Sequence, residues 1–373
     1  MSSAQPRIAI LTPYLHHASG YGGITPWMVN LANGFVARGM AVDVLVNARR
    51  ETPLRCAGLD ASARILNHGY HKPGAMWALL SYLRRQRPQV LLGAGHRYNW
   101  MAAWAGRLSR TPVRVFLSVH ENVSVGSAGM PARKQHRRFA AMRGLYPRCD
   151  GVIAVSEGVA RDLVETIGLP EGVVETIYNP VVDETLLARS REAVDHPWLQ
   201  AGEPPLILGV GRLEQQKDFP TLLRAFAALQ ARRPSRLVIL GEGRERAALE
   251  TLVAELGIAG RVALPGHVDN PFAWMRRAGL FVLSSAWEGF GNVLAEALAV
   301  GTPVVSTDCP SGPREILADG RYGPLTPVGD AVALCEAMAA TLDRPLPGTM
   351  LHQRGMDFSI EASVRAYLNR FGF

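Results

Sequence analysis

Residues 280–298 read LFVLSSAWEGFGNVLAEAL, and this stretch decides the fold class. The apolar run 280–283 predicts a buried strand, and the serines and glycines that follow it predict a loop. Leucines and alanines return at helical spacing from about Gly291, so the loop leads directly into a helix. This succession of strand, glycine-bearing loop and helix indicates an α/β fold.

The loop and the start of this helix suit an anion. Gly289 and Gly291 let the backbone approach a ligand closely, and the first turn of a helix offers unpaired amides at the positive end of its dipole. Glu288 lies in the loop, and Glu296 lies about two turns along the helix, where it can bond a hydroxyl-rich group such as a ribose. The stretch therefore predicts a sugar-nucleotide site; the alternative is that both glutamates lie on a solvated helix face.

A second stretch, residues 206–218, repeats the pattern with the sequence LILGVGRLEQQKD. Arg212 and Lys217 follow its strand, and together they can neutralise a diphosphate, the arginine as a fork and the lysine as a point charge. Strand, glycine turn and helix alternate from about residue 205 to 317. This alternation predicts parallel strands joined by crossover helices, with ligands at the carboxyl ends of the strands.

Five motifs in this half resemble those of one enzyme family. They are Gly-Val-Gly-Arg at 209–212 with Lys217, Gly-Glu-Gly at 241–243, Gly-His-Val at 266–268, Glu-Gly-Phe-Gly at 288–291 and Gly-Thr-Pro-Val-Val at 301–305. The family is that of the retaining group 1 glycosyltransferases, which carry a Glu-x7-Glu motif, here Glu288 to Glu296. The resemblance implies the GT-B fold, an α/β architecture in which two Rossmann-like domains with parallel sheets face each other across a cleft.

The resemblance also implies roles for single residues. The catalytic set is His120, which closes a predicted strand and would lie beside the reacting sugar, with Glu288, Arg212 and Lys217. The donor-binding set is Gly22, Gly23, Arg212, Lys217, His267, Val268, Glu288, Phe290, Gly291, Asn292, Val293 and Glu296. For this family a front-face displacement is inferred, so no enzymic nucleophile is required. The Gly22-Gly23 pair has an alternative interpretation as a flexible turn only.

The length of 373 residues favours two domains. The first half repeats the strand and helix alternation, and Asn179-Pro180 marks a turn at a place where the family crosses between domains. We expect an acceptor-side domain at 1–180, a nucleotide-sugar-binding domain at 181–355 and an amphipathic helix at 356–373. The resemblance implies that this helix returns to the first domain; a helix that stays on the second is the alternative.

Composition excludes several classes of protein. Hydrophobic residues make up 48% and charged residues 19%, which is an ordinary globular balance. No apolar run approaches the roughly 20 residues that span a bilayer, and the N-terminus does not read as a secretory signal. The four cysteines are scattered, and no Asp-x-Asp motif with metal ligands stands out. We therefore expect a cytoplasmic enzyme that needs no metal or other cofactor.

Charge is uneven along the chain. Residues 1–180 hold 21 Lys and Arg against 10 Asp and Glu, whereas residues 181–373 hold 19 against 22. The densest segment, 133–148, has six cations interleaved with apolar residues and no acid. This pattern predicts a basic amphipathic helix that holds the protein at the inner membrane face. A solvated helix and a nucleic-acid surface are the alternatives, although no stacking platform accompanies the charge.

The expected reaction is transfer of a hexose or N-acetylhexosamine from a nucleotide-sugar donor to a glycan or lipid-linked acceptor, with retention of configuration. Residues 305–315 resemble members that use UDP-sugars for surface polysaccharide, and GDP-mannose is the second candidate donor. A protein that only binds a nucleotide or sugar is the alternative from another class. A dehydrogenase is disfavoured because no Gly-x-Gly-x-x-Gly fingerprint is present.

Overall fold

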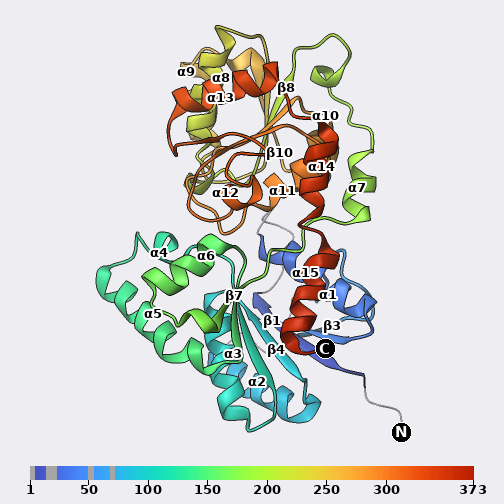
Figure 1. Cartoon of the computed structure of the whole chain (residues 1–373), viewed down its shortest axis with the longest axis vertical. Helices are drawn as coiled ribbons and strands as arrows, with labels where there is room; N and C mark the ends of the chain where they lie inside the picture. Colours follow the sequence, from blue (N-terminus) through green and yellow to red (C-terminus); the bar gives the residue numbers. More distant parts are fainter. Residues whose placement is uncertain (1–4, 14–22, 49–53, 68–71) are drawn as a thin grey trace. The chain divides into compact units, whose positions relative to one another are not determined.

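The computed structural model describes residues 5–13, 23–48, 54–67 and 72–373 (Figure 1). The chain divides into two compact units. As far as it is described, the first unit comprises the chain up to Pro180 together with Ile360–Phe373, and the second is Val181–Ser359. The expected segment 356–373 is thus divided, because residues 356–359 belong to the second unit.

The first unit is built on a parallel sheet with the strand order β3-β2-β1-β4-β5-β6-β7. Its strands are β1 (Arg7–Pro13), β2 (Ala41–Asn47), β3 (Arg64–Asn67), β4 (Val90–Ala94), β5 (Arg114–Val119), β6 (Gly151–Ala154) and β7 (Val174–Thr176). Its helices are α1 (Ile24–Ala37), α2 (Lys72–Gln86), α3 (His96–Ser109), α4 (Val123–Gly126), α5 (Ala132–Leu145), α6 (Glu157–Arg161) and α15 (Ile360–Phe371). Three short helical turns lie at Tyr146–Arg148, Asp162–Thr166 and Glu171–Val173.

The last helix, α15, packs on α1 within the first unit (Figure 1). Gly34 makes this contact possible, because a Cβ atom there would lie 2.3 Å from Cγ2 of Val364. Tyr367 and Phe371 of α15 are fully buried and stack against Phe35 of α1. The C-terminal helix therefore completes the core of the first unit.

The second unit has a parallel sheet with the order β10-β9-β8-β11-β12-β13. Its strands are β8 (Leu206–Val210), β9 (Arg236–Leu240), β10 (Val262–Gly266), β11 (Leu280–Leu283), β12 (Val304–Thr307) and β13 (Leu325–Thr326). Its helices are α7 (Glu184–Ser190), α8 (Phe219–Gln230), α9 (Arg246–Glu255), α10 (Pro271–Arg277), α11 (Asn292–Ala299), α12 (Pro313–Ile316), α13 (Ala331–Asp343) and α14 (Gly348–Met356). Single turns lie at Pro197–Leu199, Gln215–Lys217 and Ala259–Arg261.

Strands β8 and β11 are neighbours in this sheet, and Phe281 pairs with Leu208. The loops that follow them, at 211–217 and 284–291, therefore start from the same sheet edge. Both strands are buried throughout, because helices cover the sheet on its two faces. The sheet order thus brings together two motifs that are about 70 residues apart in the sequence.

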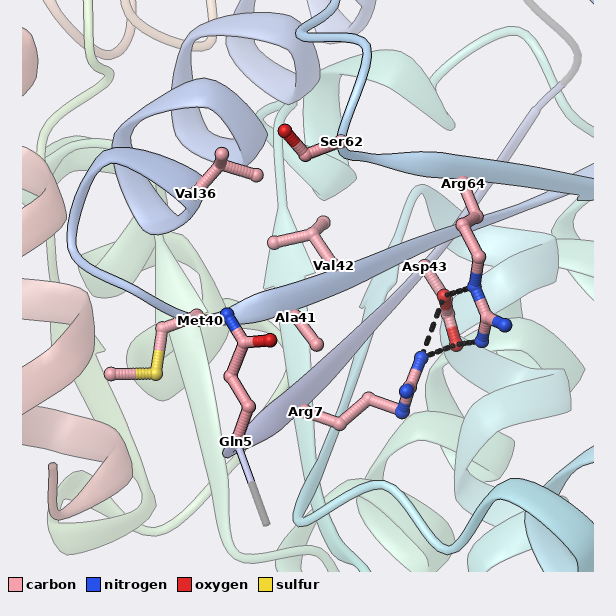
Figure 2. Close-up of a pocket in the computed structure, with 9 residues that line it drawn as sticks. All are labelled: Gln5, Arg7, Val36, Met40, Ala41, Val42, Asp43, Ser62 and Arg64. Carbon is pink, nitrogen blue, oxygen red and sulfur yellow. Dashed lines mark hydrogen bonds and ion pairs between the residues drawn. The ribbon is translucent and has the colours of Figure 1, made fainter. Parts of the chain in front are cut away.

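An ion cluster ties the first three strands of the first unit together (Figure 2). The fully buried carboxylate of Asp43 accepts hydrogen bonds from Arg7, from Arg64 on the neighbouring strand and from Tyr82. Burial opposes ionisation, but these hydrogen bonds outweigh it and hold the pKa of Asp43 below its usual range. The two arginines line a cavity of about 360 Å³ whose other walls include Val36 and Met40.

Among the described residues, no helix is long and apolar enough to cross a bilayer.

Candidate active site

The Lys217–Glu288 ion pair forms the centre of the candidate site in the second unit. Nζ of Lys217 lies 2.5 Å from Oε1 of Glu288, and the Ser285 hydroxyl donates to the same oxygen at 2.7 Å. The side chains of Lys217 and Glu288 are 13% and 8% exposed, so water screens their attraction weakly. Both hydrogen bonds converge on Oε1, so Oε2 takes part in neither of them.

Backbone contacts hold the two loops of this site together. The Ser284 hydroxyl donates to the carbonyl of Lys217, and the amide of Ala286 donates to the carbonyl of Gln216. The Gln216 side chain in turn donates to the carbonyl of Trp287. The position of Lys217 relative to Glu288 is therefore fixed by hydrogen bonds to main-chain carbonyls as well as by the ion pair.

Gly211 and Asp218 shape the loop that carries Lys217. The stem of Lys217 crosses Gly211 so closely that a Cβ atom there would lie 2.9 Å from Cε. Asp218 adopts a left-handed conformation with φ 44° and begins α8. Arg212 lies on the same loop, donates to Gln216 and is 3.7 Å from Glu214, with its side chain 40% exposed. The loop thus presents one enclosed and one accessible cation.

Helix α11 points its N-terminus at the end of the loop that carries Glu288. Gly291 precedes it with φ 98°, which a residue with a side chain adopts only with strain. The backbone of Gly312 packs on Phe290, since a Cβ atom there would lie 1.8 Å from the Phe290 carbonyl oxygen. Asn292 and Val293 form the first turn and are half-buried. Gly291 has no side chain to cap the helix, and the positive end of the helix dipole at this point attracts an anion.

Glu296 follows in α11 and carries a buried acceptor. Among the described residues, its Oε2 has no hydrogen-bond partner. Burial raises the pKa of Glu296 to about 7, and the charge of Lys217 offsets only part of that rise. A buried carboxylate oxygen without a partner is costly, so the site favours a ligand that donates a hydrogen bond there.

His267 and Val268 follow β10, two strands away from β8 in the sheet order. Gly266 turns the chain with φ 90°, and its carbonyl accepts the amide of Gly241. The His267 side chain is exposed, and its Nε2 lies 3.7 Å from Oδ1 of Asp269. These residues lie at the same sheet edge as the Lys217 loop.

His120 belongs to the first unit and follows β5. Its ring meets Trp27 of α1 edge to face, with ring centroids 4.5 Å apart. Burial lowers the pKa of His120 to about 3, so its imidazole is neutral at physiological pH, and its Nε2 has no hydrogen-bond partner among the described residues. Gly23 precedes α1, and its carbonyl accepts the amide of Trp27, the residue whose ring contacts His120. Gly22 lies outside the described residues.

Comparison with known proteins gives the family. A family model described as "Glycosyl transferases group 1" matches residues 204–344, and one described as "Glycosyltransferase Family 4" matches residues 21–185. D-inositol 3-phosphate glycosyltransferase 2 of Catenulispora acidiphila is 30% identical over 385 residues, which cover 92% of this chain and 88% of the relative. The chain belongs to the group 1 glycosyltransferase family.

Two further relatives of this glycosyltransferase align with it over different shares of their length. Lipopolysaccharide core biosynthesis glycosyltransferase LpsE of Rhizobium meliloti is 28% identical over 94% of this chain and 96% of its own length. An N-acetylgalactosamine-N,N'-diacetylbacillosaminyl-diphospho-undecaprenol 4-alpha-N-acetylgalactosaminyltransferase of Campylobacter jejuni is 34% identical over 199 residues. That alignment covers 53% of this chain and 52% of the relative, so the chain spans about half the length of that protein.

Solved structures share the fold of this glycosyltransferase. Sucrose-phosphate synthase from Thermosynechococcus elongatus superposes with a TM-score of 0.81 at 21% identity over 98% of each chain. Anabaena HepE in complex with UDP superposes with a TM-score of 0.76 at 16% identity over 97% of this chain and 98% of that one. With the two parallel-sheet units, these neighbours confirm the predicted GT-B fold.

Several residues of the glycosyltransferase site were not assigned a role from the sequence. Ser285 fixes Glu288, Gln216 joins the two loops, and Trp27 covers His120. The pair of serines after the apolar run was visible in the sequence, but nothing there showed which hydroxyl faces a carboxylate. Among the described residues, no cluster of three or more His, Cys, Asp or Glu side chains is placed to hold a metal ion.

Proposed function

We propose that this glycosyltransferase transfers a hexose or N-acetylhexosamine from a UDP-sugar to a glycan or lipid-linked acceptor with retention of configuration. The observation that carries the proposal is one edge of the second sheet. There the Lys217–Glu288 pair, the start of α11 and the unpartnered oxygen of Glu296 follow neighbouring strands. A cation, a helix N-terminus and two carboxylates match a diphosphate flanked by hydroxylated rings.

Each part of such a donor has a matching group. The diphosphate takes the start of α11 together with Lys217 and the accessible Arg212, which replace a divalent ion in neutralising it. Ribose hydroxyls donate to Glu296, which satisfies its buried oxygen. Hydroxyls of the donor sugar donate to Oε2 of Glu288, whose other oxygen is held by Lys217 and Ser285. The loop after β10, with His267 and Val268, takes the base.

The chemistry follows from this placement. The bond between the anomeric carbon and the phosphate oxygen breaks, and the acceptor oxygen bonds to that carbon from the same face. The leaving phosphate oxygen takes the acceptor proton, so no residue of the enzyme acts as nucleophile. Lys217, Arg212 and the amides at the start of α11 stabilise the charge that gathers on the leaving group. Neutral His120 contributes a hydrogen-bonding group beside the reacting sugar.

The names of the relatives support the substrate classes. The Campylobacter relative acts on a diphospho-undecaprenol-linked sugar, and LpsE is named for lipopolysaccharide core biosynthesis. The HepE structure contains UDP. We therefore assign this enzyme to surface polysaccharide or glycolipid synthesis, in the cytoplasm and peripherally at the inner membrane face.

A thermal-shift panel with UDP, GDP and ADP tests the donor. A ligand that binds only the folded state stabilises it by about 2.7 kcal/mol at a hundredfold excess over its dissociation constant. We expect UDP to raise the melting temperature most. A rise in melting temperature with GDP alone would favour GDP-mannose as the donor. Hydrolysis of a UDP-sugar without acceptor then separates a transferase, which releases UDP slowly, from a protein that only binds.

A further inference from the structure

Helices α2 and α3 of the first unit carry large apolar side chains on their outer face. Trp77 of α2 is 69% exposed, and Trp100, Trp104 and Leu108 of α3 are 45%, 37% and 48% exposed. The rings of Trp100 and Trp104 lie 6.0 Å apart, one helical turn from each other. Large exposed apolar side chains that gather on one part of a folded protein, as this tryptophan pair does, mark an interaction site.

The two helices that carry these side chains are neighbours in the first unit. Helices α2 and α3 lie side by side (Figure 1), and Arg84 near the end of α2 donates to the carbonyls of Leu108 and Ser109 at the end of α3. With a rise of roughly 1.5 Å per residue, Trp77 lies about 10 Å before that contact and Trp100 about 12 Å before it. We call the exposed residues Trp77, Trp100, Trp104 and Leu108 the α2–α3 face.

The charge around the α2–α3 face has one sign. No Asp or Glu occurs between Asp60 and Glu121. The same stretch contains nine cations: Arg64, Lys72, Arg84, Arg85, Arg87, Arg97, Arg107, Arg110 and Arg114. Arg97 and Arg107 are exposed on α3 itself, and Arg84 and Arg85 are exposed at the end of α2. Arg64 is paired with Asp43 of β2, so the cations that remain are chiefly those on the same helices as the tryptophans, and no acid in this stretch of sequence neutralises them.

We propose that the α2–α3 face docks onto an anionic lipid bilayer. Tryptophan combines a large apolar ring with a polar N–H, and it is enriched where hydrocarbon meets headgroups. Arginines beside it bind the anionic headgroups, with their stems on the apolar surface. The proposal deepens the proposed function and rests on it only for the lipid-linked acceptor, because the surface itself is independent of the donor site.

The basic segment 133–148 has a different part in this docking. Met142, Leu145 and Tyr146 are buried in the first unit and are not available to lipid. Arg138 is engaged with Glu121 and Ser127. Helix α5 therefore does not have the free amphipathic face predicted from its sequence. Its exposed residues Arg133, Lys134 and Arg137 add charge without an apolar anchor.

Vesicle sedimentation with the full chain tests the α2–α3 face. The vesicles contain phosphatidylglycerol and phosphatidylcholine, or phosphatidylcholine alone, and some carry brominated acyl chains that quench nearby tryptophans. We expect the wild type to sediment with anionic vesicles and its fluorescence to be quenched. The variant Trp77→Ser/Trp100→Ser/Trp104→Ser should bind at least about tenfold more weakly even at low salt. The charge reversal Arg133→Glu/Lys134→Glu/Arg137→Glu should weaken binding but keep the quenching of the protein that remains bound.

Two controls make the result decisive. Val332, which is 69% exposed on α13 of the second unit, gives a matched variant Val332→Ser that should bind as the wild type does. An unchanged UDP-induced thermal shift shows that the tryptophan variant is folded, and a wild type without a UDP shift contradicts the donor assignment alone. Wild-type binding by the tryptophan variant, or no vesicle binding by the wild type, overturns the proposal. So does a tryptophan variant that converts a dimer to a monomer in sedimentation velocity without vesicles, since the face would then pair two copies of the chain.

Discussion

Glu296 combines a buried, unpartnered oxygen with a pKa of about 7, and this combination gives a signature in pH. Hydroxyl donors favour the ionised carboxylate, so UDP should bind more tightly as pH rises from 6 to 8, by up to about tenfold for one linked proton. Glu296→Gln should bind UDP more weakly and lose this dependence. Isothermal titration calorimetry at pH 6 and pH 8 measures the affinity for UDP. The glutamine variant corrects for the protonation of UDP itself.

The same residue should show the opposite effect on stability. A carboxyl group whose pKa is raised in the folded state costs stability as pH rises from its unfolded value of about 4.5 through 7. Glu296→Gln removes that cost, so without ligand its melting temperature should exceed that of the wild type at pH 8 but not at pH 5. An equal difference at both pH values would contradict the buried carboxylate.

Ser285 offers a test of the role assigned to Glu288. Ser285→Ala removes a hydrogen bond to a charged group, worth about 1.5–3 kcal/mol, and frees Oε1 of Glu288 on one side. Because Glu288 is assigned to the sugar, the variant should bind the UDP-sugar more weakly while its affinity for UDP changes little. Ser306→Ala is the matched control, since that buried hydroxyl donates to a backbone carbonyl instead. Equal losses for UDP and the UDP-sugar would place Glu288 against the nucleotide.

Single residues were predictable from the sequence where they sit in a motif. The stretch 280–298 predicted a strand, a glycine-bearing loop and a helix, and the structure has β11, that loop and α11 there. The phosphate turn and the roles of Glu288 and Glu296 stay predictions. The ion pair of Lys217 with Glu288 was not predictable, because the residues are 71 positions apart and meet only through the pairing of β8 with β11. The contact of His120 with Trp27 was not predictable for the same reason, because it joins the residue after β5 to the first turn of α1.

At the scale of elements, the Asp43 cluster joins β1, β2 and β3 (Figure 2). Asp43→Asn should lower the free energy of unfolding by about 3 kcal/mol, the lower end for a broken buried pair, because both guanidinium groups reach solvent. The pKa of Asp43 is depressed, so its contribution is present above about pH 4 and is lost as pH falls further. The stability difference from wild type in urea titrations should therefore shrink from pH 6 to pH 3; a constant difference would contradict it.

Strands were predictable from the sequence where it has a continuous run of apolar residues. The strands at 280–283 and 206–210 are buried on both faces, and their runs of Leu, Ile and Val show it. Helix α5 shows where the pattern misleads. Its apolar stripe predicts an amphipathic surface equally well for a membrane or for its own domain, and only the packing of Met142 and Leu145 decides between them.

At the scale of the whole chain, folding of the first unit depends on the last helix. Gly34→Leu places a side chain where Val364 must lie, so it should displace α15 and expose Tyr367 and Phe371. We expect a destabilisation of about 3 kcal/mol, the upper end for overpacked cores, because the added side chain meets Val364 directly. The matched control is Gly144→Leu in α5, where a Cβ atom meets open space. Gly39→Leu is not suitable, because the positive φ of Gly39 would strain any side chain. Equal urea midpoints for the two variants would contradict the packing of α15.

Transfer without a metal ion is tested by UDP release from a UDP-sugar in the presence of EDTA, followed for the wild type, Lys217→Ala and Arg212→Ala. Lys217 and Arg212 are proposed to stabilise the leaving diphosphate in place of a metal ion. The wild type should therefore keep its turnover in EDTA, and each variant should lose at least about a hundredfold, as when a stabiliser of transition-state charge is removed. Turnover that EDTA abolishes and magnesium restores, or variants as active as the wild type, would contradict the account.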